Sequence, residues 1–113
     1  MPIDLDFTIE SIADTALIIR PIHISAAQTI TIGSVFVCDA SGGAFTLTLP
    51  AASAEKRILV IIKSDSSVNA VTISRDGSDT IEGSTTLSLA SQYDYAILVN
   101  DEDNGNIWYN ISK

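Results

Sequence analysis

The sequence contains little of the chemistry that catalytic and metal-binding proteins use. Its single cysteine, Cys38, excludes a disulfide within the chain, and one cysteine with one histidine, His23, cannot supply the ligands of a structural zinc site. His23 lies between two isoleucines, and the G-x-S-x-G, P-loop and dinucleotide-binding motifs do not occur. We therefore expect no enzyme activity and no cofactor.

Positive charge and long apolar runs are also scarce. The chain has 6 Lys and Arg residues against 14 Asp and Glu residues, a net charge of -8, whereas proteins that bind nucleic acids neutralise phosphates with clustered Lys and Arg. No stretch approaches the ~18 apolar residues of a membrane-spanning helix. Residues 1–4 lack the basic start of a signal peptide. We expect a protein that is made in the cytoplasm and binds neither nucleic acid nor membrane.

Apolar residues, in contrast, are abundant. Hydrophobic residues make up 46% of the 113-residue sequence and charged residues only 18%, below the quarter or so that is usual for soluble domains. A β-rich core explains part of this surplus, and Cys38 would be a small buried hydrophobe in it. Because monomers rarely expose large apolar patches, the remainder predicts a subunit interface and an oligomer.

Short apolar stretches separated by turn-forming residues run along most of the chain. Residues 44–49 and 85–89 have an apolar side chain at every second position. Residues 58–62 form a continuous apolar run, typical of a strand that is buried on both faces, and residues 51–56 form one helical turn at most. The pattern predicts an all-β, single-domain β-sandwich or barrel (jelly-roll or tulip-like) of about 8–9 short strands. We place this domain at residues 28–113, after an extended N-terminal segment of residues 1–27.

The N-terminal segment begins with the pattern of an amphipathic strand. Its apolar positions alternate with acidic and hydroxyl side chains, which places them on one face. A terminal strand of this kind needs a partner, and it either pairs within the domain or reaches a neighbouring subunit or another protein. The candidate contact residues are Ile3, Leu5, Phe7 and Ile9.

An acidic loop at residues 100–106 supplies three candidate recognition residues, Asp101, Asp103 and Asn104. Their oxygen atoms are of the kind that calcium prefers, but the spacing and the distal Glu of an EF-hand are missing. We interpret the stretch as a solvated hairpin loop that needs no metal.

Aromatic residues are few, and three of them lie toward the C-terminus: Tyr93, Tyr95 and Trp108. Tyr93 and Tyr95 share one face of an expected strand at residues 93–99, and Trp108 could lie beside it. An exposed aromatic face of this kind would suit a carbohydrate. We interpret the three residues instead as core or interface, where Tyr and Trp are common.

Four stretches of the chain resemble, in order and spacing, a small β-domain of bacteriophage virion proteins. They are similar to its D-x-S-G-G opening with an alternating strand that ends in L-P, its K-x-D-x-S-x-N-x-V-T-I centre, its D-T-I-x-G turn and its closing W-Y strand. The resemblance covers about two-thirds of the chain, and the first 36 residues have no counterpart. The stretches are Cys38-Asp-Ala-Ser-Gly-Gly-Ala-Phe-Thr-Leu-Thr-Leu-Pro50, Ile62-Lys-Ser-Asp-Ser-Ser-Val-Asn-Ala-Val-Thr-Ile73, Asp79-Thr-Ile-Glu-Gly83 and Ile107-Trp108-Tyr109.

The resemblance implies a trimeric, non-enzymatic structural protein of the virion, assembled onto the phage particle after synthesis in the host cytoplasm. One function that fits is a capsid decoration, or cement, protein that binds the phage major capsid protein as a homotrimer, with the N-terminal strand added to a capsid or sister subunit. The other is a receptor-binding or fibre-tip module that recognises a host glycan or protein through the loops at residues 39–43, 64–69 and 100–106. The short chain, without a shaft, favours the first.

Overall fold

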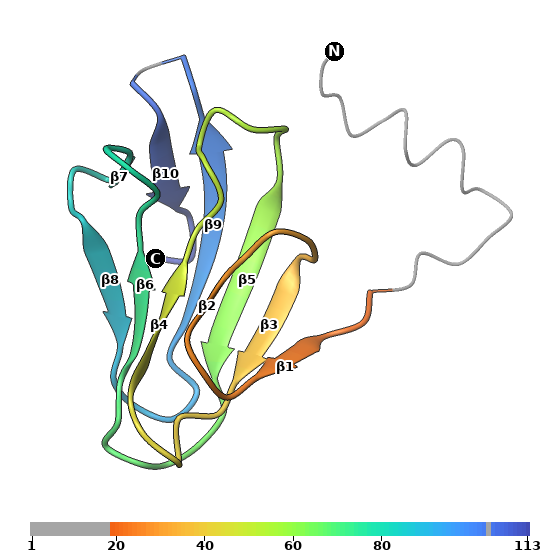
Figure 1. Ribbon diagram of the computed structural model, residues 1–113, viewed down its shortest axis with the longest axis vertical. Coiled ribbons are helices and arrows are strands. Elements are labelled where there is room, and N and C mark those ends of the chain that lie inside the picture. The colour runs from red at the N-terminus through yellow and green to blue at the C-terminus, as the bar shows by residue number, and fades with distance from the viewer. Residues whose placement is uncertain (1–18, 104) are drawn as a thin grey trace, which may run out of the picture.

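The computed structural model describes residues 19–103 and 105–113, which form two β-sheets packed face to face (Figure 1). The larger sheet has six strands in the order β1-β3-β5-β9-β10-β7, and the smaller has four in the order β2-β4-β6-β8. No helix occurs among the described residues. The all-β sandwich predicted from the sequence is confirmed, and its strands are β1 (Ile22–Ile24), β2 (Gln28–Thr29), β3 (Val35–Cys38), β4 (Phe45–Thr48), β5 (Ile58–Lys63), β6 (Val71–Ser74), β7 (Thr80–Ile81), β8 (Thr86–Leu89), β9 (Tyr95–Asp101) and β10 (Ile107–Asn110).

The first six strands wind alternately through the two sheets. Strands β1, β3 and β5 lie side by side and parallel in the larger sheet, and β2, β4 and β6 do the same in the smaller. The later strands close the sheets, because β8 and β9 run antiparallel to β6 and β5, and β10 runs antiparallel to β9. The sandwich is therefore built from parallel coils, which differ from the antiparallel connections of a jelly roll.

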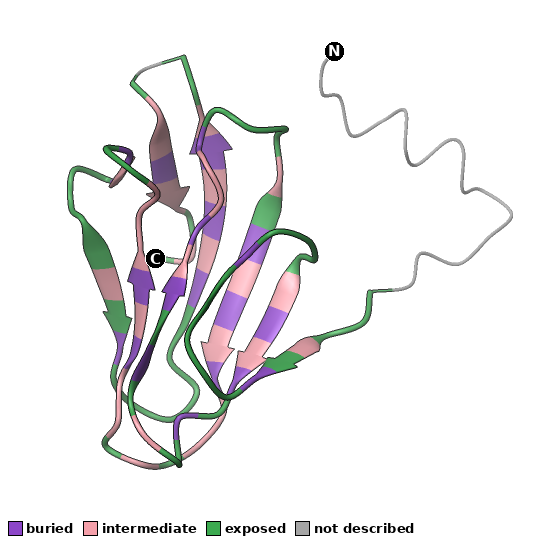
Figure 2. Cartoon of the chain, viewed as in Figure 1, coloured by how far each residue is buried: buried purple, intermediate pink, exposed green. Residues whose placement is uncertain are grey.

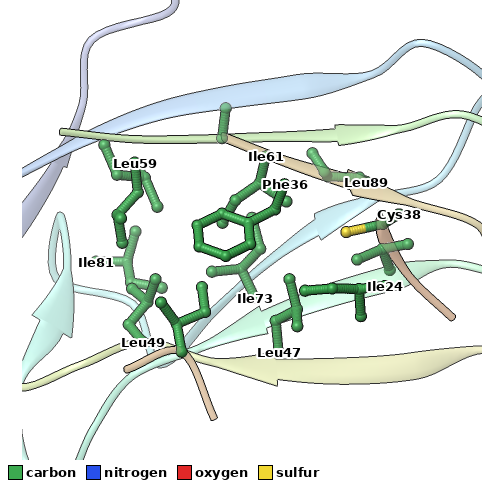
Figure 3. Close-up of a cluster of buried hydrophobic side chains, with 14 of the residues drawn as sticks. Ile24, Phe36, Cys38, Leu47, Leu49, Leu59, Ile61, Ile73, Ile81 and Leu89 are labelled. Atoms are coloured by element: carbon green, nitrogen blue, oxygen red, sulfur yellow. The ribbon is translucent and has the colours of Figure 1, made fainter. Parts of the chain in front are cut away.

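Alternation along the strands supplies the core between the sheets. Buried and partly exposed residues recur as bands along the strands (Figure 2). Leu47 and Leu49 point inward from the smaller sheet, as the sequence predicts, and meet Phe36, Leu59 and Ile61 from the larger one (Figure 3). Each fully buried side chain of this size stabilises the fold by about 1.5–3 kcal/mol, so this layer is the main source of stability.

Several local expectations need refinement. Residues 51–56 contain a single turn, in which the N–H of Ala54 donates to the carbonyl of Ala51. β1 follows Pro21 as an edge strand of the larger sheet, with His23 pointing outward. Because β1 belongs to this sheet, the sandwich begins inside the stretch assigned to the N-terminal segment. The strand expected from residue 93 begins two residues later, because Tyr93 has a φ of 70°.

A buried side chain holds the loop between β4 and β5. The side-chain oxygen of Asn100 accepts a hydrogen bond from the backbone N–H of Arg57 (2.9 Å). Its amide nitrogen lies within hydrogen-bonding distance of the carbonyl oxygens of Ala52, Ala54 and Glu55 (3.1–3.3 Å). These bonds use the loop's carbonyl groups, which explains why the stretch does not continue as a helix.

Two residues of the resembling stretches fix the same loop. The carboxylate of Asp79 accepts a hydrogen bond from the backbone N–H of Ala52 (2.8 Å). The indole N–H of Trp108 donates to the carbonyl oxygen of Pro50 (3.2 Å). Because a buried polar group without a partner is costly, these two residues and the loop stabilise each other.

A second polar cluster ties the loop after β3 to the loop after β5. Lys63 is fully buried, and its ammonium group lies 2.7 Å from the carboxylate of Asp65. Asp65 also accepts hydrogen bonds from the Ser67 hydroxyl and from the backbone N–H groups of Ala40 (2.7 Å) and Ser67 (3.0 Å). The side chain of Asn69 donates to the carbonyl of Ala40 (2.8 Å). The K-x-D-x-S-x-N stretch is therefore a structural tie between two loops.

Candidate functional site

The candidate site is the side of the six-stranded sheet that is turned away from the smaller sheet. On its four central strands, β3, β5, β9 and β10, the outward positions of neighbouring strands lie side by side in the register. All of these positions are apolar or tyrosine except Asp101, at the end of β9. We call this surface the outer face; it consists of Val35, Val37, Ile58, Val60, Ile62, Tyr95, Ile97, Val99, Ile107 and Tyr109.

The outward side of the smaller sheet has the opposite chemistry. Every outward position on β4, β6 and β8 carries a hydroxyl group, and the strand register places these groups in rows. This is the usual pattern of a sheet with one solvated face, so an apolar outward side is not a general property of the strands in this chain. We call this second surface the hydroxyl face; it consists of Thr46, Thr48, Thr72, Ser74, Thr86 and Ser88.

No layer of the described chain covers the outer face, since all ten strands belong to the two sheets and no helix is present in residues 19–103 and 105–113. Ile58 is 45% exposed and Tyr95 is 51% exposed, whereas Leu59 and Ile61, which point inward from β5, are fully buried. The expectation that residues 58–62 are buried on both faces is therefore wrong for the described part of a single chain. The inner side of β5 meets the smaller sheet, and its outer side meets no further layer within residues 19–103 and 105–113.

The chemistry of the outer face suits protein binding. Its rows contain no Asp, Glu, Lys or Arg side chain. At the rim, His23 lies beside Val37 and Asp101 lies beside Ile107. With strands about 4.8 Å apart and about 3.3 Å per residue, the four strands present roughly 400 Å² in plan. Patches of this size are the largest that ordinary monomers expose, and they are often functional. A surface of this kind binds another apolar surface by releasing water.

The four candidate contact residues of the N-terminal segment, Ile3, Leu5, Phe7 and Ile9, lie outside the described residues. Their role as contacts stays a prediction. In the described part of the chain, no helix is long and apolar enough to cross a membrane.

The acidic loop lies at one end of the larger sheet. Asp101 ends β9, and its carboxylate accepts a hydrogen bond from the backbone N–H of Asp103 (2.8 Å), while Asn104 lies outside the described residues. No group of three His, Cys, Asp or Glu side chains in residues 19–103 and 105–113 is arranged to hold a metal ion. The structure brings Asp101 to the rim of the outer face and uses its carboxylate to shape the loop.

The three aromatic residues near the C-terminus do not form one surface. Trp108 points inward and is fully buried, Tyr95 lies on the outer face, and Tyr93 lies in the turn before β9, where it is 66% exposed. Tyr93 lines a shallow groove of about 350 Å³ at the edge of the sandwich, together with Tyr95, residues 87–89, Asn110 and residues 112–113. Cys38 is also buried, and burial raises the pKa of its thiol to about 12, so it is a core residue without nucleophilic character.

Sequence reasoning predicted surplus apolar surface without locating it. The signal that could have located it is the difference between strands: residues 58–62 and 95–99 are apolar at nearly every position, whereas residues 45–48, 71–74 and 86–89 alternate with Thr and Ser. Strands with apolar residues at both odd and even positions belong to the sheet that has two apolar sides. No protein-family model matches the chain, and no curated protein matches it in sequence.

Proposed function

We propose that the chain is a non-enzymatic structural protein of a bacteriophage particle, a capsid decoration (cement) protein that works as a homotrimer. The observation that carries this proposal is the outer face, because an apolar sheet side that no described part of the chain covers is a surface for protein assembly. The resembling stretches support the phage assignment. Their polar members, Lys63, Asp65 and Asp79 among them, tie loops together, as expected of a motif that describes a scaffold.

Attachment to the phage head would use the N-terminal segment of each subunit of the trimer. In this proposal the apolar positions Ile3, Leu5, Phe7 and Ile9 add a strand to an exposed sheet edge of the phage major capsid protein. Three such contacts on one trimer bind more tightly than one, because the second and third become intramolecular. A trimer placed over neighbouring capsid subunits would then resist their separation and stabilise the shell.

The proposal is tested by locating the protein on the particle. Electron cryo-microscopy of intact phage is expected to show regular threefold density over the capsid shell. Purified protein that lacks residues 1–15 is expected to keep its far-ultraviolet circular dichroism but to lose binding to undecorated heads. Density confined to the tail, or undiminished binding by the shortened protein, would contradict decoration through the N-terminal segment.

A receptor-binding or fibre-tip module is the second candidate, and the groove beside Tyr93 favours it. The loops at residues 39–43 and 64–69 share one end of the sandwich because β3 and β5 are parallel, whereas β9 carries residues 100–106 to the opposite end. Recognition would therefore use the first two loops, which Asp65 and Asn69 tie together. A glycan array probed with the oligomer tests this function, and a reproducible signal would favour it over decoration.

A further inference from the structure

We propose that the outer face is the surface on which copies of this chain pack against one another. This inference rests on the proposed function only in taking the protein to be a homo-oligomer. It goes further by assigning the contact to one side of one sheet, with Val60 at its centre between Val35 and Ile97.

The inner side of the same sheet shows what kind of surface has to cover the outer one. On β5 the inward residues Leu59 and Ile61 pack against the smaller sheet of the same chain. The outward residues Val60 and Ile62 have the same apolar character and no sheet over them in the described residues. A second copy brings an identical apolar sheet side. In a dimer the two sides stack about 10 Å apart with interdigitated side chains, and in a trimer three such sides turn toward a common threefold axis.

Charge also favours a second copy as the occupant. The chain carries a net charge of -8, so two copies repel each other over most of their surface. The rows of the outer face hold no acidic residue, and Asp101 lies only at the rim. Contact through this side therefore brings two acidic molecules together without placing carboxylates of the two sets of rows against each other.

The extent of the outer face matches the core of an interface. Its plan area of roughly 400 Å² is about half of the ~800 Å² that each partner buries in a standard interface. The remainder has to come from residues around the outer face. Within the outer face, Tyr95 and Tyr109 have an apolar ring and a hydroxyl group, a combination that is enriched at interfaces.

The test compares the mass of the full-length chain with that of two charge variants. Val60→Glu places a carboxylate at the centre of the outer face, and Thr46→Glu places the same charge on an exposed strand position of the hydroxyl face. In sedimentation equilibrium we expect the unchanged protein and Thr46→Glu to have a multiple of the 12.0 kDa chain mass. Val60→Glu is expected to be a monomer with an unchanged circular dichroism spectrum.

A gentler variant covers the case in which Val60→Glu does not fold. Val60→Thr keeps the branched shape of the side chain and replaces one methyl group with a hydroxyl group. We expect it to raise the dissociation constant of the oligomer by at least about 10-fold, since a hydroxyl group would be desolvated in the contact. Undiminished association of both Val60 variants would overturn the inference, as would a monomeric unchanged protein at all concentrations.

The remaining outcomes separate this inference from the proposed function. A dimer that depends on Val60 supports packing through the outer face and contradicts the trimer. Association that is lost in Phe7→Glu and kept in Val60→Glu assigns the contact to the N-terminal segment and overturns the inference. Binding of undecorated heads by monomeric Val60→Glu protein would support decoration while confirming that the outer face serves self-association.

Discussion

Asn100 shows at the scale of one residue how the sandwich depends on buried hydrogen bonds. Its side-chain oxygen accepts a hydrogen bond from the backbone N–H of Arg57, and its two amide hydrogens are shared among the carbonyl oxygens of Ala52, Ala54 and Glu55. Replacement by Ala leaves these groups without partners, so we expect Asn100→Ala to lower the free energy of unfolding by about 2–3 kcal/mol. Urea denaturation followed by tryptophan fluorescence measures this change.

Asn110→Ala is the matched control for this prediction. Among the described residues, the side chain of Asn110 accepts hydrogen bonds only from Ser112, two residues away. Its removal is expected to change the free energy of unfolding by less than about 1 kcal/mol. Equal losses in the two variants would show that the loop contacts of Asn100 contribute nothing specific.

Asp65 gives the fold a dependence on pH. The Lys63 ammonium and the Ser67 hydroxyl hold the pKa of the Asp65 carboxyl well below its usual range. An unfolded chain takes up this proton near pH 4, whereas the folded protein does so only in stronger acid. This contribution to stability is therefore complete above about pH 4 and is lost as the pH falls toward the folded pKa.

The prediction is checked with Asp65→Asn. The variant is expected to be less stable at pH 7, since it leaves the buried Lys63 without its ion pair. Urea midpoints of the two proteins are expected to converge between about pH 4 and pH 2, because only the unchanged protein loses this contribution there. Midpoints that fall in parallel over this interval would mean that Asp65 does not contribute to the pH dependence.

The sequence predicted which side chains point inward better than it predicted the hydrogen bonds of buried polar side chains. Phe45, Leu47 and Leu49 were identified as inward because alternation on one strand is local information. The partners of Asp65 and Asn100 lie 25 and 43 residues away, at Ala40 and Arg57, and no local pattern specifies such pairs. The resembling stretches include Asp65 but not Asn100, and the structure gives the physical reason why both positions matter.

At the scale of the element, the turn before β3 depends on Gly33. Its φ of +96° lies in the left-handed region, and an added Cβ would collide with the Ile22 side chain and lie 3.2 Å from Phe36 Cζ. We expect Gly33→Ala to lower the free energy of unfolding by about 1–2 kcal/mol. Gly42→Ala is the control, since a Cβ there meets nothing within 4 Å. A Gly33 variant as stable as the Gly42 variant would contradict the prediction.

The strands could be predicted from the sequence, but their connection could not. A strand with alternating polarity looks the same whether its neighbour is parallel or antiparallel. The winding of β1 to β6 is set by which sheet each strand joins, and that depends on packing across the core. Asp76 and Gly77 illustrate the difficulty. An Asp-Gly pair is typical of a tight hairpin turn, but β8, the antiparallel partner of β6, begins only at Thr86, after the short β7.

At the scale of the whole molecule, every sheet is assembled from distant segments. In the register Ile22 pairs with Phe36, Phe45 with Val71, and Ile58 with Val99. Because such contacts close long loops before they stabilise anything, we expect refolding in milliseconds to seconds rather than microseconds. Stopped-flow fluorescence of the buried Trp108 after dilution from urea measures the rate. Complete recovery within the dead time of the instrument would contradict this expectation.

The surplus of apolar residues likewise became informative only at this scale. Composition predicted an interface, since a core alone does not need so many apolar residues in 113. Its position follows from the fold, because one side of each sheet faces the core and only one of the two remaining sides is apolar. The number of apolar residues can be read from the sequence, but their distribution between the core and the outer face cannot.

The parallel winding has a mechanical consequence. β1 and β2 are edge strands that each pair with a single neighbour, whereas β10 lies between β9 and β7. A force applied through the chain that precedes β1 can detach β1 and β2 first and then β3 and β4. A force on β10 has to break its hydrogen bonds to β9 and to β7 at the same time. The measurement is optical-tweezers unfolding with one handle attached to β6. We expect pulling from the N-terminus to give several small unfolding steps at low force. Pulling from the C-terminus is expected to give one unfolding step at higher force. The domain would be compliant on the side where its N-terminal segment attaches and stiff on the other.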